Sequence, residues 1–349
     1  MAQIHFQIHS SLEKLLPHSA HLAPTIQCLS GLWGETVSFQ ISFHAAEDEN
    51  RLFSSVSVKH PSCNPQIFVV EQVPCSFPCA PTATGAYLTK SPTLMPDPLV
   101  PYTGKPLRIK PFLSQILWID IPISIQDSSG DIEIVFSDRD GNCIEKTTFP
   151  LTIVPISLMP QKTQHSEWFY ADCLCDKHGC EMFSDEFFEI AAKYFRLATE
   201  HSVDTLLTPV FTPSLDIEEG GRRTPSQLVK IYPSDTGYYF DFTLFHRWVE
   251  VAKSCGIQYF EIAPFFTQWG AKCAAEIYWE TEQGTQTLFG WNTPANSLEY
   301  ANFLKQFLCQ LMPHLHQLGI ANKTFFHVSD EPYINHIEQY ETAYNAIAP

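Results

Sequence analysis

The sequence has 349 residues, 44% of them hydrophobic and 13% aromatic, and it carries a formal net charge of −17. This composition indicates a globular protein that is long enough for two domains. The negative charge argues against nucleic acid or an anionic membrane surface as a partner, because both require a basic protein surface. The sequence has no apolar run of about 18 residues, so no membrane span is expected.

The amino terminus and the cysteines favour a cytoplasmic location. Residues 1–9 alternate like a strand and lack the basic and apolar segments of an export signal. The 11 cysteines are odd in number and scattered, which is typical of a reducing compartment. Cys173, Cys175, His178 and Cys180 lie close in sequence, but their spacing is not a standard zinc pattern. We expect neither a metal nor a cofactor.

Residues 1–158 predict a β-sandwich. Residues 36–43 and 132–136 alternate polar and apolar side chains, as a strand with one buried face does. Residues 138–142 contain Gly141 and predict a hairpin turn. The proline-rich segment 77–111 is expected to run over the surface as a long loop, and prolines at 155 and 160 mark a linker.

Residues 161–349 alternate between strands and helices. Strands are predicted at 168–171, 205–211, 259–263 and 324–328, and helices at 184–201, 242–255, 297–318 and from about 335. Four such units indicate a parallel sheet and the first half of a (β/α)8 TIM barrel, since a complete barrel has eight strands and about 250 residues. The first and fourth strands would be open edges, so we expect this chain on its own to be poorly stable, to self-associate through the open barrel edge, or to be inactive.

Two adjacent carboxylates, Asp330 and Glu331, follow the last predicted strand. The apolar run 324–328 favours a strand, and Pro332 cannot extend its hydrogen bonding. Paired carboxylates at the carboxyl end of a barrel strand are typical of glycosidases. A solvated Asp-Glu turn is the alternative interpretation of this short motif.

Several separated segments resemble the family 123-like glycoside hydrolases. They are residues 167–174, 207–216, 266–272, 289–291 and 326–332, with 95–99 and 117–119 in the sandwich. The resemblance implies a β-sandwich followed by a TIM-barrel catalytic domain that acts on β-linked N-acetylhexosaminides, typically N-acetylgalactosaminides. The sequence departs from the family pattern in length, since residues 161–349 are expected to supply four strands, half of a barrel.

The resemblance also implies roles for the two carboxylates. The acetamido oxygen of the substrate would attack the anomeric carbon, and Asp330 would orient and stabilise this group as it becomes an oxazolinium ion. Glu331 would protonate the leaving oxygen and later deprotonate water. Such substrate-assisted catalysis needs no nucleophile from the protein.

Five further residues are candidates for substrate binding: Asp172, Gln268, Trp269, Trp291 and His327. Indole rings suit the apolar face of a sugar, although core packing is an equally good explanation of each tryptophan. Asp172 could bind a sugar hydroxyl or cap a helix. His327 also fits an interior histidine with satisfied hydrogen bonds.

Three other charged residues are not assigned to the site. Glu261 lies within a predicted strand and is expected to point into the barrel toward polar partners. Arg222 and Arg223 are expected in a solvated loop, from which an arginine could reach a substrate.

Two other functions remain open. The first is ordinary two-carboxylate retention, with Glu331 as acid/base and a nucleophile outside this chain. The second is a carbohydrate-binding fragment without catalysis. The aspartate at 330 favours substrate assistance, because a charged group stabilises an oxazolinium ion better than an amide does.

Overall fold

The computed structural model describes residues 4–45, 53–111 and 113–348. The chain divides into two compact units, Met1–Pro160 and Gln161–Pro349. None of the helices in these described ranges is long and apolar enough to cross a bilayer.

The first unit contains two five-stranded sheets, with the strand orders β1-β3-β8-β5-β6 and β2-β10-β9-β4-β7. A short 3-10 helix, η1 (Ala20–Leu22), follows the first strand. The strands are β1 (Ile4–Ser10), β2 (Leu29–Trp33), β3 (Thr36–Ala45), β4 (Phe53–Lys59), β5 (Gln66–Cys75), β6 (Thr93–Pro101), β7 (Leu107–Arg108), β8 (Gln115–Pro122), β9 (Gly130–Ser137) and β10 (Cys143–Ser157).

Alternating apolar residues of these strands build the core of the first unit. On β3, Phe39 and Ile41 are fully buried, and Phe39 pairs with Ile119 of β8. Phe39 also meets Phe149 of β10 edge to face, with 5.0 Å between the ring centroids. The predicted strand patterns therefore bury their apolar faces as expected.

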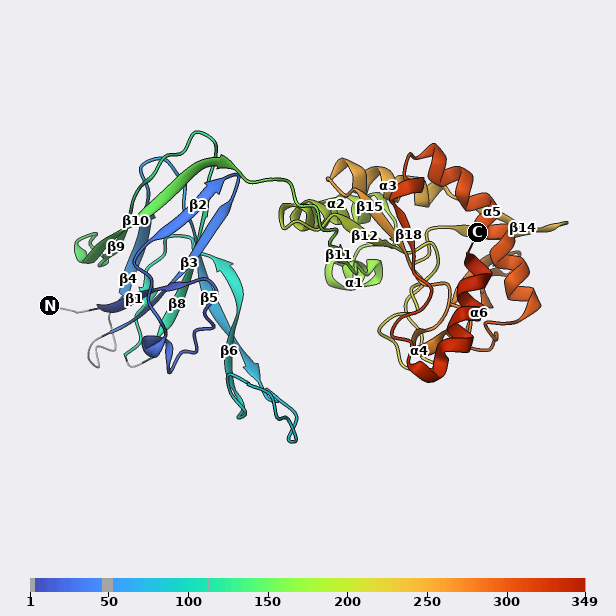
Figure 1. Ribbon diagram of the computed structural model, residues 1–349, viewed down its shortest axis with the longest axis horizontal. Helices are drawn as coiled ribbons and strands as arrows, with labels where there is room; N and C mark the ends of the chain where they lie inside the picture. Colours follow the sequence, from blue (N-terminus) through green and yellow to red (C-terminus); the bar gives the residue numbers. More distant parts are fainter. Residues whose placement is uncertain (1–3, 46–52, 112, 349) are drawn as a thin grey trace. The chain divides into compact units, whose positions relative to one another are not determined.

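The prediction of one long loop over residues 77–111 was wrong. This segment contains β6, which pairs with β5, and the short strand β7. The prolines of β6 are tolerated because it is the last strand of its sheet, where an N–H group need not be donated. Figure 1 shows the β5–β6 pair extending beyond the rest of its sheet.

The second unit is built on a four-stranded parallel sheet with the order β11-β12-β15-β18. Its strands are β11 (Ser166–Glu167), β12 (Thr205–Thr208), β15 (Tyr259–Ile262) and β18 (Thr324–Phe326). Two antiparallel hairpins interrupt the connections, β13 (Lys230–Ser234) with β14 (Gly237–Asp241) and β16 (Ile277–Thr281) with β17 (Gly284–Phe289). The fold is thus multidomain, a β-rich unit followed by an α/β unit.

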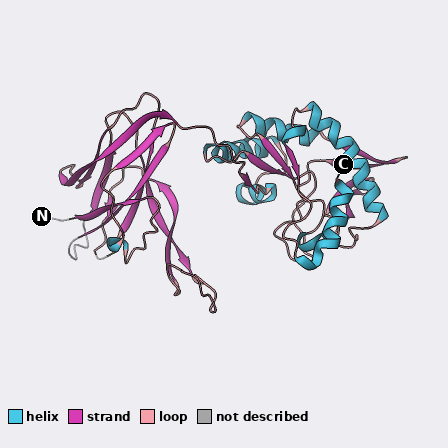
Figure 2. Ribbon diagram, in the orientation of Figure 1, coloured by secondary structure: helices cyan, strands magenta, loops and turns pink. Residues whose placement is uncertain are grey.

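Helices flank this parallel sheet (Figure 2). They are α1 (Ala171–His178), α2 (Asp185–Glu200), α3 (Thr243–Ser254), α4 (Gln268–Ala271), α5 (Leu298–Gln317) and α6 (Ile337–Ile347), with the 3-10 helices η2 (Ala321–Lys323) and η3 (Ile334–His336).

The predicted ends of the long helices agree with the structure. The Ser184 and Ser297 hydroxyls accept hydrogen bonds from Phe187 N and Tyr300 N, at 3.1 and 3.3 Å, and so cap α2 and α5. Gly256 follows α3 with a φ of 100°, a conformation that favours glycine.

The first predicted strand of this unit is displaced. The pairing with β12 ends at Glu167, and residues 168–170 lie outside the sheet before α1 begins. The chain leaves the sheet where Tyr170 hydrogen-bonds to Asp216 in the loop after β12. At the other side of the sheet, β18 pairs with β15 through three residues, and Phe325 is 44% exposed.

Candidate functional site

Asp330 and Glu331 lie just beyond the carboxyl end of β18. After β18, Val328 and Ser329 are buried, and the Ser329 hydroxyl donates to the Thr267 carbonyl at 2.9 Å. Asp330 is then half-buried and Glu331 is exposed. The carboxylates therefore follow directly on a segment that is anchored to the neighbouring loop after β15.

That loop contains α4, a turn without regular helical geometry that we call the Trp269 turn (Gln268–Ala271). The Trp269 N–H donates to the Asp330 carbonyl at 2.9 Å, and Gln268 Nε2 donates to Asp330 Oδ2 at 3.3 Å. The turn thus holds Asp330 by both its backbone and its side chain. Gln268 is 8% exposed, and its Oε1 has no hydrogen-bond partner among the described residues.

The backbone of this turn is strained. Trp269, Gly270 and Ala271 have φ values of 56°, 104° and 54°, in the left-handed region. This region costs a residue with a side chain about 1–2 kcal/mol. Trp269 is 36% exposed, so a large aromatic side chain remains accessible beside Asp330. Strain at such a place is often part of a functional site.

Glu331 differs from Asp330 in its surroundings. Its carboxylate makes no hydrogen bond or ion pair with the described residues. Its backbone also lies in the left-handed region, with a φ of 45°. One carboxylate is therefore fixed by neighbours, and the next one is free.

Asp172 is a buried residue in the first turn of α1, where it contacts the loop after β12. Arg223 Nε donates to Asp172 Oδ2 at 2.7 Å, and the guanidinium lies 3.9 Å from the centroid of the Tyr170 ring. The Tyr170 hydroxyl donates to Asp216 Oδ2 at 2.6 Å. Burial, and then the Asp216 carboxylate, raise the pKa of Tyr170. The Asp172 Oδ1 atom has no partner among the described residues.

The expectation that both arginines are solvated was wrong for Arg223. Its side chain is 11% exposed, whereas that of Arg222 is 71% exposed. The neighbouring Gly220-Gly221 pair suggested an open loop, but Arg223 turns inward because Asp172 and the Leu215 carbonyl accept its hydrogen bonds.

His327 contacts a second buried carboxylate, Glu261 of β15. His327 Nδ1 and Glu261 Oε1 are 2.9 Å apart, and Ser166 and Trp168 donate to Glu261 at 2.5 and 3.2 Å. Burial alone would raise the pKa of Glu261, but the hydrogen bonds from His327, Ser166 and Trp168 hold it below its usual value. The prediction of polar partners for Glu261 is confirmed. The hydrogen bonds connect His327 to this network rather than to Asp330 or Glu331.

Trp291 lies just after β17, and its indole N–H donates to the Gly221 carbonyl at 2.8 Å. Trp291 is therefore hydrogen-bonded to the loop that contains Arg222 and Arg223, whereas the backbone of Trp269 is hydrogen-bonded to Asp330. The sequence analysis placed Arg223 in a solvated loop, and it did not single out Tyr170, Asp216 or the buried Glu276. Glu276 had no signal beyond its own charge, in a segment predicted as loop.

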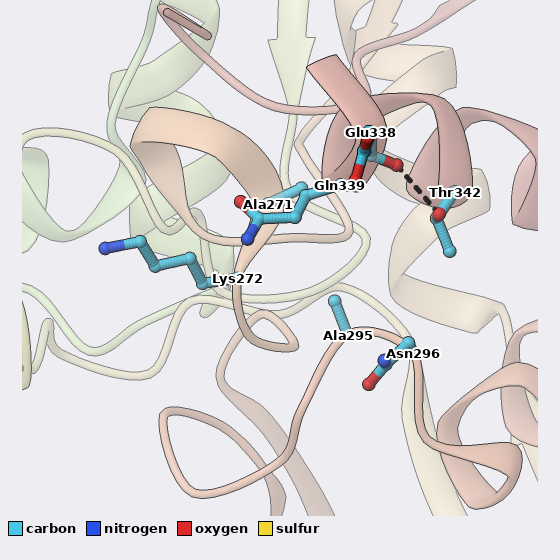
Figure 3. A pocket seen from close by; sticks show the side chains of 7 residues that line it. All are labelled: Ala271, Lys272, Ala295, Asn296, Glu338, Gln339 and Thr342. Atoms are coloured by element: carbon cyan, nitrogen blue, oxygen red, sulfur yellow. Dashed lines mark hydrogen bonds between the residues drawn. The ribbon is translucent and has the colours of Figure 1, made fainter. Parts of the chain in front are cut away.

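A cavity of about 290 Å³ lies beside the Trp269 turn, between its end and α6. Ala271, Lys272, Ala295, Asn296, Glu338, Gln339 and Thr342 line it. Figure 3 shows Lys272 directed away from the side chains of α6, where the Thr342 hydroxyl donates to the Glu338 carbonyl. None of the predicted site residues lines this cavity, so it is a neighbour of the site and not the site itself.

The model of the glycoside hydrolase 123 catalytic domain matches residues 168–349, more than half of the chain. The chain belongs to glycoside hydrolase family 123. Among solved structures, a family 123 glycoside hydrolase from Clostridium perfringens, described for glycolipid glycan hydrolysis, aligns with a TM-score of 0.70 at 15% sequence identity. The alignment covers 99% of this chain and 62% of that one, so the chain spans less than two thirds of that structure. This similarity supports a shared fold.

Two other structures align only with parts of the chain. The alignment with the BIgI domain of the beta protein of S. agalactiae, at 12% identity, covers 45% of this chain and 100% of that domain. The alignment with a Niemann-Pick type C2 protein from the Japanese carpenter ant, at 13% identity, covers 44% of this chain and 92% of that protein. Both have a TM-score of 0.20, and neither supports an argument about this chain. No curated protein is similar enough in sequence to count as a relative.

Proposed function

We propose that the protein is a retaining glycoside hydrolase that cleaves β-linked N-acetylhexosaminides, N-acetylgalactosaminides above all, with assistance from the substrate's acetamido group. Family membership supports the reaction class. The description of the Clostridium perfringens structure makes a glycolipid glycan a reasonable substrate to test. Residues 161–349 would be the barrel-type catalytic domain, and residues 1–158 a sandwich domain without catalytic groups.

The observation that carries the proposal is the difference in contacts and exposure between the two adjacent carboxylates. Asp330 is held by the Gln268 amide and the Trp269 N–H, whereas Glu331 is exposed and unpaired among the described residues. A group that orients and stabilises an acetamido group must be fixed before the reaction. A group that carries a proton to and from solvent must be accessible. Asp330 suits the first role and Glu331 the second.

The reaction would proceed in two steps. First, the acetamido oxygen attacks the anomeric carbon while the glycosidic bond breaks, and Glu331 gives its proton to the leaving oxygen. Asp330 accepts a hydrogen bond from the acetamido N–H, which becomes more acidic as the oxazolinium ion forms. Second, water attacks the anomeric carbon, Glu331 takes its proton, and the oxazolinium ring opens to the acetamido sugar with retained configuration.

Two unpaired buried acceptors also fit a sugar ligand. Gln268 Oε1 lies in α4 beside Asp330, Asp172 Oδ1 lies in the first turn of α1, and neither has a partner among the described residues. A buried acceptor without a donor is costly, so a ligand that supplies hydroxyl donors would bind well there. Trp269 would offer its indole face to the sugar ring.

The test compares inhibition by N-acetylgalactosamine-thiazoline, a stable analogue of the oxazolinium ion, with activity on an aryl β-galactoside that lacks the acetamido group. We expect strong competitive inhibition and no cleavage of the galactoside. Equal cleavage of an aryl β-N-acetylgalactosaminide and of the aryl β-galactoside would favour a protein nucleophile. Sugar binding without any turnover, unchanged by Glu331→Gln, would favour a non-catalytic carbohydrate-binding protein.

A further inference from the structure

A second pocket in the same loop region has no role in the proposed reaction. Its volume is about 410 Å³, and it lies between the loop after β12 and the β16–β17 hairpin with its following segment. The residues that line it are Gly220, Arg222, Glu276, Thr287, Leu288, Phe289, Gly290, Trp291, Asn292 and Thr293. It combines an aromatic ring, a charged pair and small polar side chains, a typical composition of a carbohydrate-binding pocket.

Glu276 is the unusual residue of this pocket. Its side chain is 7% exposed, and its Oε1 atom lies 3.3 Å from Arg222 Nε. Its Oε2 atom has no hydrogen-bond partner among the described residues. Burial raises the pKa of the neighbouring Tyr278, and an interaction of its hydroxyl with the Glu276 carboxylate and the charge of that group raise it further. A buried carboxylate oxygen without a donor is expensive to maintain, and a ligand with hydroxyl groups could supply that donor.

Both walls of the pocket continue into the candidate site. Arg222 precedes Arg223, which binds Asp172, and the Trp291 indole donates to the Gly221 carbonyl between the two walls. On the other side, residues 272–276 lead directly from the Trp269 turn to Glu276. The Ala274 N–H donates to the Thr293 carbonyl at 2.9 Å, which ties this segment to the pocket rim.

From this arrangement we infer that the pocket binds a neutral saccharide unit, a further sugar of the substrate, whose hydroxyl groups donate to Glu276 Oε2. The inference rests on the proposed function for its statement that the sugar belongs to the substrate. Arg222 already faces one carboxylate oxygen and leaves the other as an acceptor. An acidic sugar would bring its own carboxylate against that acceptor, so the pocket favours a neutral one.

The experiment measures binding of methyl β-galactopyranoside to the full chain by calorimetry, with galacturonate as the acidic probe. N-acetylgalactosamine-thiazoline is present in excess to occupy the proposed catalytic site. Thr287→Trp fills the pocket from an exposed strand position, and Gln286→Trp is its control, because Gln286 is the exposed neighbour that does not line the pocket. Glu276→Gln tests the acceptor, and Glu280→Gln, on the strand β16 that follows Glu276, is its control.

We expect Glu276→Gln to weaken galactoside binding by about tenfold or more, the effect of losing a hydrogen bond to a charged group. Thr287→Trp should weaken binding by at least as much, because the indole fills the pocket. Both controls should bind as the wild type does. Equal binding by all five proteins, no binding to the wild type at millimolar galactoside, or tighter binding of galacturonate would overturn the inference. Because Thr287 is exposed, its variant remains informative if Glu276→Gln unfolds.

The outcome is separable from that of the proposed function. Failure of thiazoline inhibition and of cleavage, with galactoside binding intact, would count against the catalytic proposal and leave the pocket standing. Normal cleavage of an aryl glycoside by Thr287→Trp, with unchanged binding of the galactoside, would reject the pocket and leave the catalytic proposal standing.

Discussion

The two units of this chain differ in where their backbone is strained. Among the described residues, six non-glycine residues have a positive φ, and all six belong to the second unit. Four of them, Asp216, Trp269, Ala271 and Glu331, lie on loops after strands of the parallel sheet. The sandwich achieves its turns with glycines such as Gly34, Gly104 and Gly141, which adopt this conformation at little cost.

Unpaired buried acceptors show a related contrast. In the second unit, the unpaired acceptors are Asp172 Oδ1 in α1, Gln268 Oε1 in α4 and Glu276 Oε2 just before β16, all in segments that follow strands of the parallel sheet. Glu261, within the sheet, is instead bonded to three neighbours. The segments that follow the strands of the parallel sheet therefore hold three of the unpaired buried atoms, and the others among the described residues are His60 Nε2, Gln72 Oε1 and Trp248 Nε1. The difference teaches that strain and unpaired groups mark the place where the fold is adapted to a ligand.

The largest effect is expected at the free carboxylate. Glu331→Gln should lower kcat by about 10²–10⁴-fold, because the general acid and base is lost. The loss should be smaller for an aryl glycoside whose leaving group needs no proton. Steady-state kinetics with a series of aryl leaving groups measures this. Equal losses across the series would contradict the assignment of Glu331 as the acid.

The fixed carboxylate should have the next largest effect. Asp330→Asn should lower kcat by about 10²-fold or more, because an amide stabilises the developing oxazolinium charge less well. The leaving-group dependence should stay as in the wild type, which separates this variant from Glu331→Gln. A variant of Asp330 with normal kcat would show that the contacts with Gln268 and Trp269 serve structure alone.

Two adjacent arginines of the second unit should contribute differently to the free energy of unfolding. Arg223→Ala should destabilise the protein by about 3 kcal/mol, because it leaves the buried Asp172 carboxylate unpaired. Arg222→Ala should cost less, about 1 kcal/mol, because solvent screens the mostly exposed Arg222 side chain even though its partner Glu276 is buried. Denaturant unfolding of both variants measures the difference. Similar values for both would mean that the Arg223–Asp172 pair contributes little.

The smallest effect concerns the strained backbone itself. Glu331→Gly should be more stable than Glu331→Ala by about 1 kcal/mol, because glycine tolerates the φ of 45° and alanine does not. Neither variant has the acid group, so both should be inactive. Thermal unfolding of the pair measures the strain without interference from catalysis. If alanine is as stable as glycine, the strain at this position is negligible.

The sequence predicted what local chemistry decides. The caps of α2 and α5, the glycine after α3 and the position of Asp330 and Glu331 after β18 all follow from short segments. Alternating apolar residues likewise predicted the strands of the sandwich core.

Long-range contacts were beyond the sequence. Arg223 turns inward because it meets Asp172, 51 residues earlier in the chain. The Trp269 turn adopts its left-handed backbone where it binds Asp330, and Gln268 reaches that residue across 62 positions. In the sandwich, the sequence did not predict the strand β6, because prolines are unfavourable within a sheet. They are tolerated here because β6 lies at the edge of its sheet.

The central claim is that the acetamido group of the substrate is the nucleophile while the loops position it. The most direct test measures kcat/KM for aryl N-acylgalactosaminides with zero, one, two and three fluorine atoms on the acetyl methyl group. Fluorine withdraws electrons from the acetamido oxygen, so the account predicts a steep fall in kcat/KM with each added fluorine. Rates that do not change along this series would contradict it.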